Sequence, residues 1–387
     1  MNSKFPDGFF WGSATSSYQI EGEIKNDWSE AANGGKVPLA GKACDSYNRY
    51  EEDFDVAKEL GQNAHRLSIE WARIEPKEGE FNEAEIEHYR KVIDALLDRG
   101  IEPFVTLWHF TLPVWFAEKG GFENSDSPEI FARYCKYVVE KIGERVKFWL
   151  TINEPMVYAS NGYLRGKWPP FRKNIFKFIN VVDNLIMSHN LAYKKIKGLN
   201  PSIQIGIAKN NIYFHSGNVI VYQALSSFLT WFWNLRFLNR ISDSVDFIGL
   251  NYYFHRRFTH SESRKTKLPA SDLGWDIFPE GIFHVLNQLR RYNKTVFITE
   301  NGIADAEDRR RAKYIVEHLK QVKKSIDAGV DVKGYFYWSL LDNFEWSEGF
   351  GPKFGLVEIE SGTLARKIKP SARIYEKICR SNSLENE

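Results

Sequence analysis

Cysteine is scarce in this sequence, and neither sign of charge is in surplus. Among its 387 residues the only cysteines are Cys44, Cys135 and Cys379. An odd number of widely spaced cysteines argues against a disulfide framework or a zinc site and favours a reducing compartment, so we expect a cytoplasmic protein. The 52 basic and 50 acidic residues leave a formal net charge of +2, which gives no electrostatic reason to expect nucleic acid as a partner.

Long apolar runs and several chemical signatures are missing as well. Residues 1–8 lack the apolar stretch of a signal peptide, and no run of about 18 apolar residues indicates a membrane partner. No HExxH, GxSxG or phosphate-loop motif is present, which argues against a catalytic metal, a serine nucleophile and a nucleotide site. We therefore predict no cofactor and no metal.

Aromatic residues, in contrast, are abundant. The chain has 28 Phe, 18 Tyr and 12 Trp, which together make 15% of its residues. Such side chains fill cores, and they also stack on flat, half-apolar ligands such as sugars. Composition alone leaves both interpretations open.

Short apolar runs alternate with amphipathic segments along the whole chain. Eight strand-like runs separated by helices indicate parallel βα units, and this number favours a closed (β/α)8 TIM barrel of the α/β class, as a single domain over residues 1–387. An open doubly wound sheet is the alternative, but the first strand is not followed by a Gly-rich phosphate turn. The predicted strands are 9–14, 64–69, 103–107, 148–152, 203–208, 246–251, 296–299 and 334–338. The predicted helices include 83–99, 128–143, 175–198, 281–292 and 308–328.

Two local features complete the predicted domain. The basic run Arg309, Arg310 and Arg311 opens a helical stretch, and we expect it to form a solvated face. At the other end, we expect a short flexible tail at about residues 381–387.

Polar and aromatic residues gather where the predicted strands end. Active sites of such barrels are built at the carboxyl ends of the strands, so these side chains should meet at one end of the barrel. Amides, carboxylates, an imidazole and indoles suit a polyhydroxylated ligand, because indoles cover its C–H face and polar groups bind neighbouring hydroxyls. Arg66 lies within the second predicted strand, and the residues at or after strand ends are Gln19, His109, Asn153, Glu154, Asn251, Tyr253, Glu300, Trp338, Glu345 and Trp346.

Glu154 and Glu300 stand out, since each ends an apolar strand and has an Asn beside it. A single Glu in such a place is most often a surface residue or half of an ion pair, but two of them across one barrel favour catalysis. Glycoside hydrolysis with retention needs two carboxyl groups about 5–5.5 Å apart. Arg66 would keep one of them anionic, while burial and the neighbouring negative charge would raise the pKa of the other.

The motifs of this chain resemble those of glycoside hydrolase family 1, the β-glucosidase and β-glycosidase family. The similarity runs from about residue 5 to residue 380. Its segments, in chain order, are residues 9–22, 66–71, 151–155, 247–253, 298–302 and 338–346.

The resemblance implies a role for each site residue. Glu300 would be the nucleophile, and Glu154 the general acid/base. Asn153 would bind the sugar 2-hydroxyl, and Arg66 and Tyr253 would hold the Glu300 carboxylate. The remaining substrate-binding residues would be Gln19, His109, Asn251, Glu345 and Trp346 for the nonreducing-end sugar, Trp338 as its stacking floor with Phe354 nearby, and Trp275 beside the aglycone.

Two comparisons within the family refine this prediction. Family members that act on 6-phosphosugars carry Ser where this chain has Glu345, so we expect neutral β-glycosides or oligosaccharides as small-molecule partners, glucosides foremost and galactosides or fucosides possible. The connection at about residues 209–245 is shorter than usual, and Phe110 stands where many members have Trp. Both differences predict unchanged chemistry behind an altered rim.

Alternatives remain open at this stage. The aromatic run at residues 228–238 is interpreted as a helix packed on the barrel, with an exposed apolar patch as the alternative. The same machinery would also serve a transglycosylase, and a catalytically silent sugar-binding barrel is the alternative from another class. The motifs do not predict an oligomeric state.

Overall fold

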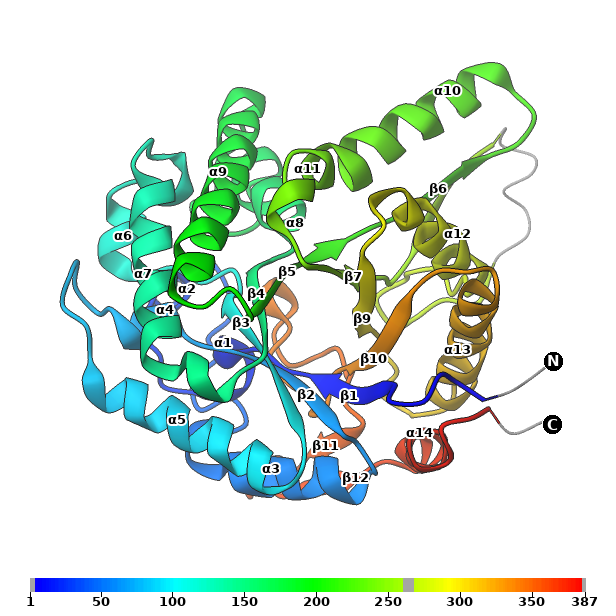
Figure 1. Cartoon of the computed structure of the whole chain (residues 1–387), viewed down its shortest axis with the longest axis horizontal. Coiled ribbons are helices and arrows are strands. Elements are labelled where there is room, and N and C mark those ends of the chain that lie inside the picture. The colour runs from blue at the N-terminus through cyan, green and yellow to red at the C-terminus, as the bar shows by residue number, and fades with distance from the viewer. Residues whose placement is uncertain (1–3, 260–267, 385–387) are drawn as a thin grey trace.

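The computed structural model describes residues 4–259 and 268–384, and a closed barrel of parallel strands lies at its centre (Figure 1). Around the barrel the strands follow the order β1-β10-β9-β7-β5-β4-β3-β2. They are β1 (Phe10–Ala14), β2 (Ala64–Ser68), β3 (Glu102–Trp108), β4 (Phe148–Asn153), β5 (Gln204–Asn210), β7 (Phe247–Asn251), β9 (Thr295–Asn301) and β10 (Val332–Trp338). The predicted TIM barrel is confirmed, and each predicted strand end lies within two residues of the observed one.

Helices surround the barrel. The longer ones are α3 (Ser46–Glu59), α5 (Glu83–Asp98), α7 (Ser127–Ile142), α9 (Ile175–Leu199), α12 (Glu280–Leu289), α13 (Arg311–Asp327) and α14 (Pro370–Ser381). The shorter ones are α1 (Ser17–Ile20), α2 (Asp27–Asn33), α4 (Trp71–Ile74), α6 (Val114–Glu118), α8 (Pro155–Ala159), α10 (Ile220–Leu229) and α11 (Arg236–Asn239). Two small sheets, β6 (Tyr213–Ser216) with β8 (His255–Phe258) and β11 (Val357–Ile359) with β12 (Arg366–Ile368), lie outside the barrel.

Helix α5 shows how local sequence sets these elements. The Asn82 side chain accepts a hydrogen bond from the Ala84 amide at 3.0 Å and so caps the first turn. Apolar residues at helical spacing, Ile86 and Val92 among them, are buried against the barrel. Gly100, at a φ of +66°, takes the left-handed conformation that ends the helix.

Only the first residue of the basic run before α13 is solvated as we expected: Arg309 is exposed, whereas Arg310 is half-buried and Arg311 is buried. Arg311 is fully buried, forms an ion pair with Asp308, and donates to the Lys353 carbonyl at 2.7 Å. Arg310 forms an ion pair with Asp305 at 3.1 Å. The prediction was wrong for Arg310 and Arg311 because these arginines face acidic loop residues that share the same end of the barrel, and α13 begins only at Arg311.

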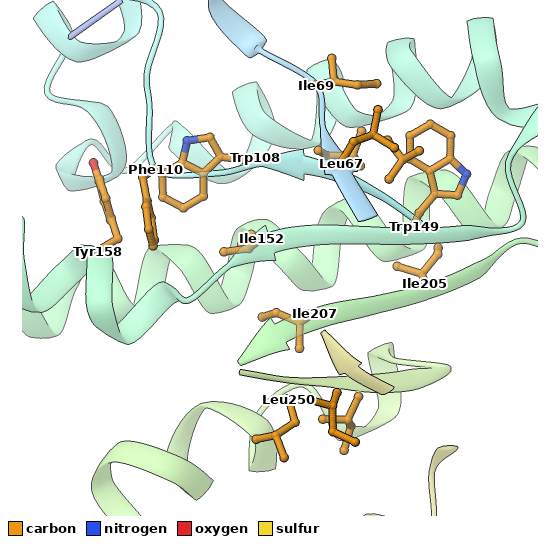
Figure 2. Close-up of a cluster of buried hydrophobic side chains, with 14 of the residues drawn as sticks. Leu67, Ile69, Trp108, Phe110, Trp149, Ile152, Tyr158, Ile205, Ile207 and Leu250 are labelled. Carbon is orange, nitrogen blue, oxygen red and sulfur yellow. The ribbon is translucent and has the colours of Figure 1, made fainter. Parts of the chain in front are cut away.

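The core has two apolar layers. Inside the barrel, phenylalanines from different strands meet, and the rings of Phe104 and Phe148 stack with their centroids 4.3 Å apart. Outside the strands, a second cluster fills the space below the helices; Figure 2 shows part of it, including Trp149, Ile152 and Ile205. Because the aromatic layer fills the barrel interior, a ligand has room only at the carboxyl ends of the strands.

The connection between β5 and β7 extends away from the barrel (Figure 1). Helix α10 continues through a π-helical segment (Thr230–Leu235) into α11. Phe228 is 55% exposed and Trp231 is 46% exposed, whereas Phe237 and Leu238 are buried. The aromatic run is therefore helical as expected, but its two halves differ: the second packs on the barrel and the first forms an exposed apolar stripe.

The chain ends meet beside β1 (Figure 1). The Phe5 amide donates to the Asn382 carbonyl at 2.9 Å, and the Trp11 indole donates to the Asn382 side chain at 2.9 Å. Of the predicted tail, residues 381–384 are thus described and residues 385–387 lie outside the described residues. Within residues 4–259 and 268–384, no helix is long and apolar enough to cross a membrane.

Candidate active site

The two glutamates singled out in the sequence lie at the carboxyl end of the barrel. Glu300 is the second-last residue of β9, and Glu154 directly follows β4. Glu154 has a φ of +42°, and its amide donates to the Ala208 carbonyl of β5 at 2.8 Å. This uncommon backbone conformation ends the strand and turns the side chain into the site.

Glu300 is surrounded by groups that stabilise its anionic form. Arg66, from β2, forms a buried ion pair with one carboxylate oxygen. The Tyr253 hydroxyl donates to the other oxygen at 2.6 Å. Burial raises the pKa of Glu300, and the Arg66 charge and the Tyr253 hydrogen bond act in the opposite direction.

Glu154 is in a different setting. Its carboxyl accepts a hydrogen bond from the Asn251 amide at 2.9 Å, and no cation contacts it within the described residues. Burial, reinforced by the negative charge of Glu300, raises the pKa of Glu154 to about 8. Two carboxyls of one residue type therefore differ in charge preference, because only one of them has a guanidinium partner.

Asn153 and Asn251 join the two carboxyls into one network. Arg66 donates to the Asn153 side chain at 2.7 Å, and Asn251 donates to the same Asn153 oxygen at 3.2 Å. Hydrogen bonding by Asn251 also lowers the pKa of Glu300, so this amide lies between the two carboxyls. We refer to Glu154, Glu300 and their contacts Arg66, Asn251 and Tyr253 as the carboxyl floor.

His109 is buried beside the carboxyl floor. Its Nε2 accepts from the Asn153 amide at 3.1 Å, which leaves the proton on Nδ1. That Nδ1 is buried and has no partner among the described residues. Burial, together with the Arg66 charge, holds the pKa of His109 well below its usual range, so the ring is a neutral donor.

A third carboxyl, that of Glu345, faces the other two. Gln19 donates to it at 3.4 Å and to the Phe344 carbonyl at 2.7 Å. Burial and the charges of Glu300 and Glu154 raise the pKa of Glu345 to about 8. Gln19 and Glu345 thus present adjacent polar groups, as binding of neighbouring hydroxyls requires.

Aromatic rings enclose this polar centre. The His109 ring is nearly parallel to two indoles, with ring centroids 5.9 Å from Trp338 and 6.0 Å from Trp346. On the Glu300 side, the Trp275 ring is 5.8 Å from Tyr253 and 6.1 Å from Phe354. Contacts therefore link eleven of the thirteen predicted site residues, and Gln19 and Glu345, which contact each other, are joined to them because Glu345 directly precedes Trp346 in the chain.

Several contributing residues were missed by sequence reasoning. Thr106 accepts from Arg66 at 3.0 Å, Thr299 donates to Asn251 at 2.7 Å, and Asn343 accepts from Gln19 at 3.0 Å. Each orients a predicted residue. Thr299 and Asn343 lie within the motif segments 298–302 and 338–346, whereas nothing in the local sequence distinguishes Thr106. Lys209, fully buried at the end of β5, was also missed, although a lysine ending an apolar strand is a visible signal. Among the described residues, no group of three His, Cys, Asp or Glu side chains could hold a metal ion.

A parallel (β/α)8 barrel with buried carboxyls among amides and indoles at its carboxyl end defines the class of carbohydrate-active barrel proteins. The family model of glycosyl hydrolase family 1 matches residues 1–216 and 234–384. The chain belongs to this family, and it is an O-glycosyl hydrolase of the β-glucosidase type.

Individual relatives agree with this assignment. The β-glucosidase A of Thermotoga maritima is 36% identical over an alignment of 442 positions that covers 99% of both chains. A β-galactosidase of Pyrococcus woesei is 29% identical and covers 98% of both chains. Among solved structures, a β-glycosidase from Pyrococcus horikoshii superimposes with a TM-score of 0.93 at 40% identity, covering 100% of this chain and 97% of that one. The T. maritima β-glucosidase in complex with deoxynojirimycin gives a TM-score of 0.90 at 36% identity, covering 99% of this chain and 100% of that one.

Proposed function

We propose that this chain is a retaining β-glycosidase that removes the nonreducing-end sugar from neutral β-glycosides or oligosaccharides, glucosides foremost. The unequal setting of the two buried glutamates carries the proposal. Glu300 has a cation and a hydroxyl donor at its carboxylate, whereas Glu154 has a neutral amide and a raised pKa. One carboxyl is thus prepared as an anion and the other as an acid, as double displacement requires.

The reaction follows from this arrangement in two steps. A Glu300 oxygen attacks the anomeric carbon, the bond to the leaving oxygen breaks, and Glu154 donates its proton to that oxygen. The Glu154 carboxylate then takes a proton from water, whose oxygen attacks the same carbon and releases Glu300. Asn153 binds the 2-hydroxyl, a contact that strengthens in the oxocarbenium-like transition state.

Substrate preference is supported by the other groups of the site. Gln19, the free Nδ1–H of His109 and Glu345 supply hydroxyl contacts, and Trp338 supplies a stacking face. Three carboxyls served by the one guanidinium of Arg66 disfavour a sugar phosphate. Solved T. maritima neighbours are complexes with deoxynojirimycin and glucoimidazole, which supports glucose as the preferred sugar. Three free cysteines support a reducing, cytoplasmic location.

The nucleophile assignment is tested by replacing Glu300 with Ala. We expect kcat/KM on an aryl β-glucoside to fall by about 10⁴-fold or more. Added azide should then fill the vacated space and yield the glycosyl azide of inverted configuration. Glu154→Ala with azide should yield the retained configuration and should lose more activity on poor leaving groups than on good ones. Near-normal turnover by Glu300→Ala would overturn the proposal; Glu358→Ala, at an exposed position of β11, is the control.

A further inference from the structure

Arg310 connects two loops at the carboxyl end of the barrel, and the proposed mechanism does not use it. It lies directly before α13, at the end of the loop that follows β9. Its guanidinium forms an ion pair with Asp272, donates to the Ala270 carbonyl at 2.5 Å, and donates to the buried Asp305 carboxylate at 3.1 Å. A planar guanidinium with five donors can hold two carboxylates and a carbonyl in fixed directions at once. Arg310 therefore fixes the segment 270–272 relative to the β9–α13 loop.

Asp305 is the anchored end of this junction. Its side chain is buried, and the amides of Arg310 and Arg311 donate to its carboxylate at 2.7 Å and 3.0 Å. Burial raises the pKa of Asp305, but the hydrogen bonds from Arg310 and the charge of Arg311 lower it by more, so this carboxyl is an anion. The guanidinium of Arg310 thus starts from a fixed partner and reaches from it to the neighbouring loop.

The segment that Arg310 holds also carries Trp275. Ser271 lies between the two residues that Arg310 contacts, and two hydrogen bonds join it to Trp275. The Ser271 amide donates to the Trp275 carbonyl at 2.9 Å, and the Ser271 hydroxyl accepts from the Trp275 amide at 3.1 Å. Gly274, at a φ of +72°, closes this tight turn. A displacement of residues 270–272 would therefore also displace the indole.

The Trp275 indole borders the carboxyl floor. Its ring centroid lies 5.8 Å from that of Tyr253, whose hydroxyl donates to Glu300. The rings of Phe254 and Phe354 are 5.3 Å and 6.1 Å away. Trp275 is only half-buried, so these neighbours leave part of the indole open. An open aromatic face this close to the nucleophile can stack on the group that leaves the sugar.

We propose that Arg310 is a positioning residue for aglycone binding: by holding Ala270 and Asp272 against Asp305, it fixes the Trp275 indole as a wall for a flat, aromatic aglycone. This inference rests on the proposed function, and it adds the class of β-glycoside that the site favours. Arg310 contacts neither reacting carboxyl, so its effect should depend on the aglycone and not on the sugar.

Other contacts hold the same turn and set the size of the expected effect. The Ala306 amide donates to the Asp272 carboxylate at 2.7 Å. On the far side of the indole, the His255 Nε2 lies 3.4 Å from the Asp276 carboxylate. Removal of Arg310 should therefore loosen the wall without unfolding it, and the loss should be partial.

The test compares Arg310→Met with the unchanged protein on two glucosides that differ only in their leaving group. On 4-methylumbelliferyl β-glucoside, whose aglycone is a flat aromatic ring system, kcat/KM should fall by about 3- to 10-fold, as expected for loss of an aromatic stack. The change should lie mainly in KM, because a wall contacts the aglycone before and during bond cleavage alike. On β-glucosyl fluoride, whose leaving group is a single atom with no face to stack, kcat/KM should be unchanged. An equal fall on both substrates, or no fall on the first, would overturn the proposal.

Further variants keep the test decisive. Asp272→Ala removes the same contact from the other loop, so it should reproduce the selective loss even if Arg310→Met fails to fold. Trp275→Ala removes the wall itself and should lower kcat/KM on the aryl glucoside at least as much, and adding Arg310→Met to it should cause no further loss. A further loss in that double variant would show that Arg310 acts elsewhere and would contradict the proposal, as would unchanged kinetics of Asp272→Ala. Arg309→Met is the matched control, because Arg309 is the exposed neighbour that pairs with Glu307 at 3.0 Å; its kcat/KM should stay the same on both substrates.

The unchanged protein separates this inference from the function on which it rests. If it hydrolyses neither glucoside, the proposed function fails, and the inference fails with it. If it hydrolyses both and Arg310→Met keeps the ratio of the two kcat/KM values, only the inference about Arg310 fails.

Discussion

The carboxyl floor and the β5–β7 connection lie at the same end of the barrel but are built in opposite ways. Every polar group on the floor contacts another one, and all of its residues fall within the stretches that the family model matches. The connection contains residues 217–233, which that model leaves unmatched, and it exposes Phe228 and Trp231. A network in which each group orients the next tolerates little change, whereas a segment held at a few points is free to differ.

Removing one residue of the carboxyl floor should greatly reduce kcat/KM. Arg66→Met leaves Glu300 buried without its cation, so Glu300 should hold a proton at neutral pH and cease to be a nucleophile. We expect kcat/KM on an aryl β-glucoside to fall by about 10³-fold or more. The acidic limb of the remaining activity should move to higher pH. Steady-state kinetics across a pH series measure both effects.

A second buried arginine supplies the control for this prediction. Arg366 pairs with Asp53 at 2.7 Å away from the site, and both side chains are buried. Arg366→Met should lower the free energy of unfolding by about 3–5 kcal/mol, as breaking a buried pair does, yet leave kcat/KM nearly unchanged below the melting temperature. If Arg66→Met behaved like Arg366→Met, the floor would be a structural ion-pair network rather than a reactive site.

Substitutions in the β5–β7 connection should affect stability according to whether the replaced side chain is buried or exposed. Phe237→Ala removes a fully buried ring and should cost about 3–5 kcal/mol of unfolding free energy. Phe228→Ser removes an exposed ring and should change it by no more than about 0.5 kcal/mol. Chemical denaturation of both variants, with kcat/KM on a small aryl glucoside, tests the division. A large loss of stability in Phe228→Ser would mean that the exposed stripe packs against something in solution.

The sequence predicted the barrel because eight apolar runs with helical segments between them have few other arrangements. It also predicted that thirteen named residues would gather at the carboxyl end of the barrel, because most of them lie at or after a strand end or within a motif of the family; their roles stay predictions. It did not predict Thr106, which orients Arg66, because a hydrogen bond between distant segments leaves no local pattern. It failed at Arg311 because an ion pair with Asp308 and a hydrogen bond to the distant Lys353 carbonyl hold that side chain in the interior.

The smallest expected effect concerns the pH dependence of the free energy of unfolding that the buried carboxyl of Glu154 causes. The pKa of Glu154 is about 8 in the folded protein against an ordinary value of 4.5. Because the folded value is raised, the protonated carboxyl stabilises the fold fully below about pH 4.5. This contribution is lost as the pH rises through about 8, where the buried group must ionise.

Glu154→Gln does not titrate and should escape this loss. Its melting temperature should therefore exceed that of the unchanged protein by a few degrees at pH 9 and match it closely at pH 4.5, although its activity on poor leaving groups is largely gone. Thermal melts across this range measure the difference, and Glu358→Gln on exposed β11 should show none. An equal melting temperature at both pH values would mean that Glu154 ionises without cost in the folded state. The carboxyl floor would then carry no more cost in stability at alkaline pH than the β5–β7 connection does.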